Sequence, residues 1–314
     1  MKHACPRENE TTLDEAERIE SASVVLSSAW MGCLPILFLP LMVVVLRPRL
    51  VPWEFMWILA VSIFLSLKWL TWWRVRNRVT HRPWRSAAYL LAWPGMDAEA
   101  FLDDAQRAPP PSALAWLWAI LNTAFGVALL WFVTRTIPQQ QRLLRGWIGM
   151  LGLILLLHFG TFQIMALMWQ RLGVQAKPIM SAPLRSTSLG EFWGKRWNLG
   201  FRQLAHELIF HPLHRTLGAG AAGFLVFVVS GLIHDLVISL PAGAGYGLPT
   251  SYFLLQGVGM TVEHSEFGRR IGLGRGVLGW FFMVALVAGP VFWLFHPWFV
   301  ERVILPFMQA IHAL

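Results

Sequence analysis

The sequence is poor in charge. Only 14% of its 314 residues are Asp, Glu, Lys or Arg, against about 25% in an ordinary soluble domain. Together with a high apolar content, this excludes a disordered chain and argues against a water-soluble enzyme. Cysteine is also scarce, and Cys5 and Cys33 form no CxxC pair. A framework of several disulfides and a CxxC-type site are therefore excluded.

Apolar residues are abundant instead. They make up 56% of the chain, include 18 Trp and 21 Phe, and give a mean hydropathy of +0.52. They cluster in runs that one hydrophobic core of ordinary size could not absorb. A transmembrane helix needs about 20 mostly apolar residues. Seven runs are candidates: 24–46, 51–73, 112–133, 146–169, 218–240, 246–263 and 277–298.

These runs predict an all-α polytopic membrane protein with about seven to eight transmembrane helices and some interfacial helices. The polar residues 1–23 are predicted to form a cytoplasmic tail, and 24–314 one membrane-embedded domain. The weakest run, 246–263, is rich in glycine. The closing stretch 299–314 is short and interrupted, so we expect an interfacial helix. Lys68 can extend its ammonium to the interface if it lies near a helix end.

The net charge of +9 would suggest nucleic-acid binding in a soluble protein. Here the cations flank apolar runs and set orientation, so we expect membrane lipids and no nucleic acid as partners. With seven spans, 19 of the 26 Lys and Arg residues fall on one side, six on the other, and Lys68 inside a run. The positive-inside rule then places the N-terminus and the long segments 74–111 and 170–217 in the cytoplasm.

His234 stands inside the fifth run, one turn after Ser230 and directly before Asp235. An ionisable group inside a span is costly unless it faces protein or water, which makes it a functional candidate. Neutral imidazole is the usual general base near neutral pH. A histidine that only packs against a neighbouring helix is equally compatible with this position.

The segment 192–198 reads Phe-Trp-Gly-Lys-Arg-Trp-Asn. Asn198 can donate a hydrogen bond to an oxygen on which negative charge develops, or it can cap the following helix. The aromatic residues beside two cations also suit a plain membrane interface. Apolar residues recur at helical spacing over 201–208, which predicts an amphipathic surface helix interrupted near Pro212.

Three histidines in the same region invite a metal interpretation. His206 and His211 are five residues apart, which turns them about 140° away from each other on a regular helix. The HExxH zinc motif needs a spacing of four. His211 and His214 are three apart, a spacing that also occurs by chance. The sequence therefore predicts no metal site.

Taken together, these motifs resemble the membrane-bound O-acyltransferase (MBOAT) superfamily, most closely its wax synthase branch. Residues 192–198 are similar to that branch's FWGRRWN-type motif, and 229–235 to its VSGLxHE motif. The 36 residues from Asn198 to His234 also resemble the family spacing. Weaker similarities lie at Trp93–Asp97, a PGMD-like element of bacterial relatives, at Phe253–Gly257 with Glu263, and at Trp293–Pro297. Two positions depart from the pattern: Asp235, where Glu is usual, and Gln256, where His is frequent.

The resemblance implies an MBOAT-like helical fold around a tunnel, in a bacterial-type inner membrane. It implies acyl transfer from acyl-CoA to the hydroxyl of a lipophilic alcohol, with no metal and no cofactor beyond the acyl-CoA co-substrate. His234 would be the general base and Asn198 the second catalytic residue. Expected substrate-binding residues are Trp193, Trp197, Lys195, Arg196, Ser230 and Asp235.

Two alternatives remain at this point. Short relatives of the family acetylate terpenoid or polyketide hydroxyls, so the acyl group and the acceptor stay open. In another functional class, His234, His158 and Lys68 would line the proton path of a proton-coupled membrane transporter. No inverted repeat of the kind that many transporters carry is found in the sequence.

Overall fold

A computed structural model describes residues 30–314. The expected polar tail 1–23 and the start of the first apolar run lie outside the described residues. Within 30–314 every regular element is helical, which confirms the predicted all-α class. Six helices there have the length and composition to cross a membrane: Trp30–Arg49, Pro52–Val75, Ala113–Thr136, Arg142–Arg171, Leu199–Ala242 and Gly276–Leu294. The chain is a multi-pass membrane protein.

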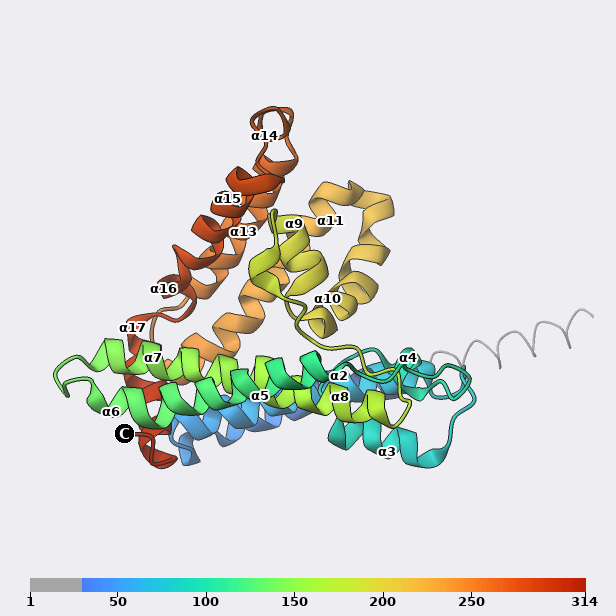
Figure 1. The fold of residues 1–314 in the computed structure, drawn as a ribbon, viewed down its shortest axis with the longest axis horizontal. Coiled ribbons are helices and arrows are strands. Elements are labelled where there is room, and N and C mark those ends of the chain that lie inside the picture. The colour runs from blue at the N-terminus through green and yellow to red at the C-terminus, as the bar shows by residue number, and fades with distance from the viewer. Residues whose placement is uncertain (1–29) are drawn as a thin grey trace, which may run out of the picture.

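The first half of the chain forms a layer of long helices, horizontal in Figure 1. This horizontal layer consists of helix Trp30–Arg49, α2 (Pro52–Val75), α5 (Ala113–Val127) with η2 (Ala128–Val133) and α6 (Thr134–Thr136), and α7 (Arg142–Ile154) with η3 (Leu155–Thr161) and α8 (Phe162–Arg171). Two short helices, α3 (Pro83–Ala92) and α4 (Ala98–Leu102), lie at one end of it. The Asp97 side chain accepts from the Ala100 N–H at 3.0 Å, so the predicted helix cap is present.

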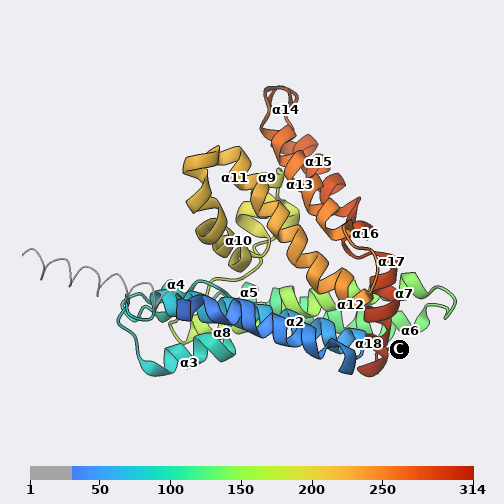
Figure 2. The same cartoon turned by 180° about the vertical axis from the view of Figure 1, so that it is seen from behind.

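The second half stands on one face of this layer as an inclined group of helices, seen from both sides in Figures 1 and 2. Its elements are η4 (Pro183–Arg185), α9 (Leu189–Glu191), η5 (Phe192–Arg196), α10 (Leu199–Ala205), η6 (His206–Phe210), α11 (His211–His234), η7 (Asp235–Ser239), α12 (Leu240–Ala242), α13 (Leu248–His264), α14 (Glu266–Ile271), α15 (Gly276–Ala288) and α16 (Val291–Leu294).

The expected run 246–263 forms α13, a helix of 17 residues that contacts both α11 and α15. It is shorter than the six candidate spans. The chain leaves α11 near the horizontal layer and enters α15 at the opposite end, beside α14 (Figure 2). α13 therefore carries the chain back between two apolar helices, which is what a seventh pass would do.

The amphipathic segment after Asn198 breaks at a different place from the one expected. Pro212 is accommodated in the first turn of α11, directly after the π-helical turn η6. The chain turns instead at Gly218, whose φ of 80° and ψ of 160° are open to glycine but strained for other residues. Figure 1 shows that α11 folds back on itself.

The C-terminal stretch, expected to lie on the membrane surface, packs inside the helix bundle. It forms α17 (Pro297–Phe299), η8 (Val300–Ile304) and α18 (Leu305–Ala310). Val300, Val303 and Met308 are fully buried and belong to the largest core cluster. They pack against α2 and α7, because glycines on α7 leave room for their side chains.

Lys68 is fully buried within α2 and does not reach a membrane surface. Its Nζ donates to the Gly95 carbonyl at 2.6 Å and lies 3.1 Å from the centroid of the Tyr89 ring. A carbonyl and an aromatic face stabilise an ammonium group that has lost its water. Lys68 thus joins α2 to the Trp93–Asp97 turn.

Candidate active site

His234 lies at the last turn of α11, where the helix passes into the π-helical turn η7. Its Nδ1 is 2.6 Å from the carbonyl oxygen of Ser230. A carbonyl oxygen can only accept, so Nδ1 carries the proton and the neutral ring keeps its lone pair on Nε2. The ring also packs on Phe253, with 4.4 Å between the ring centroids. Backbone and aromatic contacts therefore fix the ring and leave a basic nitrogen.

The backbone around His234 approaches α13 closely. A Cβ at Gly231 would lie 2.7 Å from the Cα of Thr250, so only glycine allows the two helices to cross here. The crossing brings Phe253 of α13 against the histidine ring. Gly231 of the sequence motif is thus required by packing beside the candidate base.

His234 lines a cavity of about 360 Å³, which we name the first cavity. Its wall is formed by η5, α10, η6, α11 and α13. The expected site residues found in this wall are Trp193, Trp197, Asn198, Ser230 and His234. The structure therefore brings the two sequence motifs, 36 residues apart, to one space.

The segment that carries Trp193 and Asn198 is anchored at its start. The Ser188 side chain accepts from the Glu191 N–H at 2.9 Å. Glu263 of α13 accepts from the backbone N–H groups of Leu189 at 2.6 Å and Gly190 at 3.2 Å. A carboxylate at the first N–H groups of a helix satisfies donors that have no partner within the helix. Glu263 thereby ties the segment to α13.

Trp193 and Trp197 give the first cavity aromatic walls. Trp193 packs edge-on against Phe227 and tilted against Phe253, with ring centroids 6.1 and 5.7 Å away. Its indole N–H lies 3.4 Å from Oε1 of Gln256, a fully buried amide whose Nε2 donates to the Leu286 carbonyl at 2.8 Å. Gln256 therefore links the cavity wall to α15.

Asn198 caps a helix, one of the two functions that the sequence left open for it, and its other amide atom stays available. Its φ of 42° and ψ of 61° are left-handed, and its Oδ1 accepts from the Phe201 N–H at 3.2 Å, so it caps α10. The Nδ2 group has no hydrogen-bond partner among residues 30–314. Because Asn198 lines the first cavity, this amide is available as a donor to a ligand.

A second cavity of about 580 Å³ lies between the horizontal layer and α10–α11. Its wall is almost entirely apolar and comes from α2, η3, α8, α10 and α11. Asn198, Phe201 and Ile233 line both cavities and therefore lie between the two spaces. Each cavity is lined by a different histidine: His234 lines the first and His158 the second.

The neighbours of His234 differ in their placement. Ser230 lines the first cavity, and its hydroxyl donates to the Val226 carbonyl at 2.7 Å. Asp235 does not line it. The Asp235 carboxylate accepts from the backbone N–H groups of Gly247 at 2.9 Å and Thr250 at 3.1 Å. Asp235 thus holds the start of α13 against η7, and no contact supports the expected substrate-binding role.

The two expected cations also differ. Arg196 is paired with Glu191, with 2.7 Å between its Nη2 and Oε1. The pKa of the Glu191 carboxyl lies below its ordinary value, first because the Thr187 N–H donates to it and second because Arg196 does. Lys195 is exposed, and no ion pair of Lys195 is found in the described part of the chain. Neither cation lines the first cavity.

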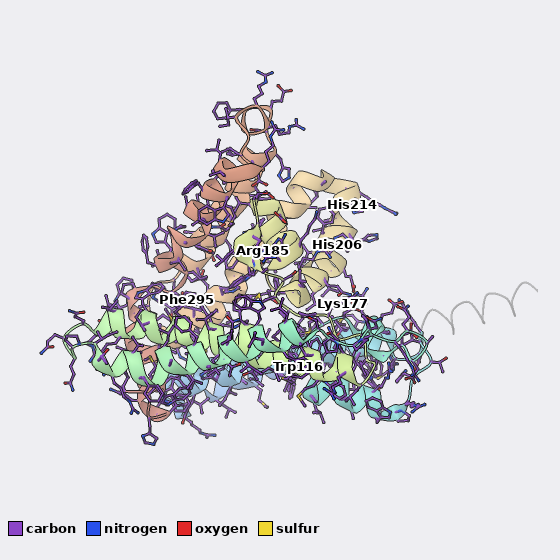
Figure 3. All side chains as sticks on the ribbon, viewed as in Figure 1. Trp116, Lys177, Arg185, His206, His214 and Phe295 are labelled. Atoms are coloured by element: carbon purple, nitrogen blue, oxygen red, sulfur yellow. The ribbon has the colours of Figure 1, made fainter. Side chains whose placement is uncertain are left out.

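Arg202 was expected from the sequence as a partner of the coenzyme A phosphates, whereas His206 was not expected at the site. Both line the first cavity and are exposed. His206 and His214 lie on the α10–α11 segment (Figure 3). The imidazole of His206 stacks on Phe210, 5.3 Å away. No group of three His, Cys, Asp or Glu side chains within residues 30–314 is placed to hold a metal ion. The helical position of Arg202, one turn after Asn198, was the available signal.

Comparison with known proteins agrees with this geometry. Residues 176–255, which contain Asn198, His234 and the cavity wall between them, match the membrane bound O-acyl transferase family. The predicted resemblance is confirmed, including its wax synthase-like branch.

The similar proteins are plant enzymes by name. The chain is 31% identical over 147 residues to the probable long-chain-alcohol O-fatty-acyltransferase 7 of Arabidopsis thaliana, covering 42% of each chain. It is 29% identical over 200 residues to the probable long-chain-alcohol O-fatty-acyltransferase 3 of the same plant, covering 55% of this chain and 58% of the relative. The long-chain-alcohol O-fatty-acyltransferase of Simmondsia chinensis is 31% identical over 147 residues, 42% of this chain and 40% of its own. The chain thus spans about half the length of these relatives.

Proposed function

We propose that the protein is an acyl-CoA:alcohol O-acyltransferase that esterifies a lipophilic, long-chain alcohol. The observation that carries the proposal is the His234 imidazole, fixed with its proton on Nδ1 and lining the same cavity as the free Nδ2 of Asn198. The names of the similar proteins support the reaction class and the acceptor. The geometry supports a base and an oxyanion donor at one point.

The chemistry follows from these two groups. An alcohol is far too weak an acid to ionise at neutral pH, so it needs a base as it attacks. Nε2 of His234 takes the hydroxyl proton while the oxygen bonds to the thioester carbon, and negative charge develops on the carbonyl oxygen. Asn198 Nδ2 donates to that oxygen. The carbon–sulfur bond then breaks, and the thiolate of coenzyme A leaves with the proton from His234.

Each cavity suits one substrate. The first cavity has a cationic mouth, where Arg202 and His206 are exposed, and the phosphates of coenzyme A are anionic. Lys195 is exposed nearby on η5 and adds positive charge. The second cavity is apolar, and Val61, Leu65 and Leu91 in its wall are exposed on the lipid-facing surface. We assign the acyl-CoA head to the first mouth and the alcohol to the second.

We further propose that the N-terminus and the segment 170–217 lie in the cytoplasm. The charge bias of 19 to six supports this orientation. It gives a water-soluble acyl-CoA direct access to the first cavity. The reaction needs no metal, because a thioester is already activated and its thiolate is a good leaving group.

The deciding experiment measures release of coenzyme A by the purified protein in detergent, with a long-chain acyl-CoA and 1-hexadecanol. We expect His234→Ala to lower turnover by about 10²–10⁴-fold, the usual effect of losing a general base. The control is His206→Ala, which changes the cavity mouth and removes no base, and should lose far less. Wild-type turnover in His234→Ala, or equal losses in both variants, would contradict the assignment.

A further inference from the structure

His158 is a polar residue in the apolar second cavity that the proposed reaction does not use. It lies on η3 in the horizontal layer, and its ring meets Phe162 edge-on, 5.5 Å away between centroids. The other residues of the wall are almost all apolar, apart from Asn198, which also lines the first cavity. His158 is therefore well placed to meet whatever chain fills this space.

The imidazole of His158 has no hydrogen bond to any described residue, and its Nδ1 is buried without a partner. The other ionisable groups buried in the spans are satisfied: Lys68 donates to Gly95 and His234 to Ser230. Buried polar groups in proteins are hydrogen-bonded in the great majority of cases. The indole Nε1 of Trp57, in the wall of the same cavity, is also buried without a partner. A small number of polar groups in an apolar pocket is the usual means of orienting a ligand.

We propose that the second cavity binds the alcohol, and that His158 forms a hydrogen bond to a second polar group on that alcohol. This inference rests on the proposed function. The group is not the reacting hydroxyl, because His234 lines only the first cavity and His158 only the second. A neutral imidazole offers one donor and one acceptor, so a hydroxyl or a carbonyl oxygen along the chain fits.

The preferred acceptor is thus a lipophilic alcohol with a further hydroxyl or keto group, in place of a plain alkanol. A polar group on the acyl chain would have the same chemistry. We assign the cavity to the alcohol because its apolar wall reaches the lipid-facing surface at Val61, Leu65 and Leu91. The acyl-CoA enters from the cationic mouth of the other cavity.

The test compares acceptors of equal length. Purified protein is assayed with one acyl-CoA and with 1-hexadecanol or hexadecanediols whose second hydroxyl occupies successive carbons. We expect kcat/KM to peak at one diol, about tenfold above 1-hexadecanol, the size of one hydrogen bond in a desolvated site. His158→Leu should remove the peak, so that kcat/KM for the diol falls to the variant's own value for 1-hexadecanol. The matched control, Phe162→Leu in the same wall, should preserve the ratio between the two acceptors.

Equal kcat/KM for all acceptors in the wild type, or a peak that survives in His158→Leu, would overturn the inference. So would a preference for a hydroxyacyl-CoA over the plain acyl-CoA that His158→Leu abolishes, because it would assign the cavity to the acyl chain. Equilibrium binding of the radiolabelled diol without acyl-CoA gives an independent readout. Binding of the diol should weaken in His158→Leu even if the protein acylates no alcohol. Absence of acylation would contradict only the proposed reaction.

Discussion

At the scale of single residues, we propose that the Asn198 amide has a chemical task beside its structural one. Its Oδ1 caps α10, and its left-handed backbone restricts the position to residues that tolerate positive φ, chiefly Gly, Asn and Asp. Its Nδ2 remains for a ligand in the first cavity. The two tasks use different atoms, so a substitution can separate them.

Asn198→Asp is the substitution that separates them. Aspartate keeps the capping oxygen and tolerates the backbone conformation, so the protein should fold with an almost unchanged melting temperature. It replaces the donor by a negative charge beside the developing oxyanion, and turnover should fall by at least about 10²–10³-fold. The measurement is coenzyme A release together with thermal unfolding in detergent. Normal turnover in a folded Asn198→Asp protein would reduce Asn198 to a helix cap.

Sequence reasoning selected His234 and Asn198 as candidates because each stands inside a motif and has a chemical role as the alternative to a structural one. It did not find the task of Asp235. The backbone groups that bind this carboxylate, at Gly247 and Thr250, follow 12 and 15 residues later, across a turn. Nothing in the local pattern shows how that turn closes. A carboxylate next to a histidine in sequence points to another side of the helix, about 100° away.

At the scale of elements, the candidate active site depends on how the 188–198 segment is attached to α13. Glu263 makes that attachment through two backbone N–H groups, and its side chain is buried. The π-helical turns η5 and η7 place Asn198 and the end of α11 on the same space. Turns of this kind occur frequently at functional sites. Their position does not follow from apolar periodicity, so the sequence did not predict these two turns.

We expect Glu263→Gln to lower both stability and turnover. The amide keeps one accepting oxygen, so one of the N–H groups of Leu189 and Gly190 loses its charged partner, at a cost of about 1–3 kcal/mol. Trp193 is then no longer held in a fixed position in the wall of the first cavity. We therefore expect kcat to fall more than the affinity for acyl-CoA. Thermal unfolding and steady-state kinetics measure the two effects. The control is Glu266→Gln, an exposed residue whose carboxylate pairs with Arg270. Equal behaviour of the two variants would contradict the role of Glu263.

The elements that sequence alone located best are the long apolar runs, because lipid demands about 20 apolar residues in a row and little else. The stretch 299–314 could not be placed in this way. Its burial depends on glycines of α7 that receive Val300 and Met308, where a Cβ at Gly146 or Gly149 would lie 2.2 or 2.3 Å from those side chains. Such complementarity between distant segments leaves no trace in local hydropathy.

At the scale of the whole molecule, the first cavity lies among the inclined helices, and the second lies between them and the horizontal layer. The wall of the second cavity combines α2, η3 and α11, which are far apart in the chain. The position of Asn198 between the two cavities therefore results from the whole fold and not from any single motif. In the proposed reaction, the two cavities give the two substrates separate routes toward His234 and Asn198.

Those two routes require a defined orientation in the membrane, and this gives the last prediction. Ser181 lies in the cationic segment 170–217, and Gln139 in the loop between α6 and α7 at the other end of the horizontal layer (Figure 1). Both are exposed. In a background with Cys5→Ser and Cys33→Ser, a membrane-impermeant maleimide applied to intact cells should label Gln139→Cys and spare Ser181→Cys. Both should react after permeabilisation. Labelling of Ser181→Cys in intact cells would place the mouth of the first cavity away from cytoplasmic acyl-CoA, and the assignment of the donor to that mouth would fail with it.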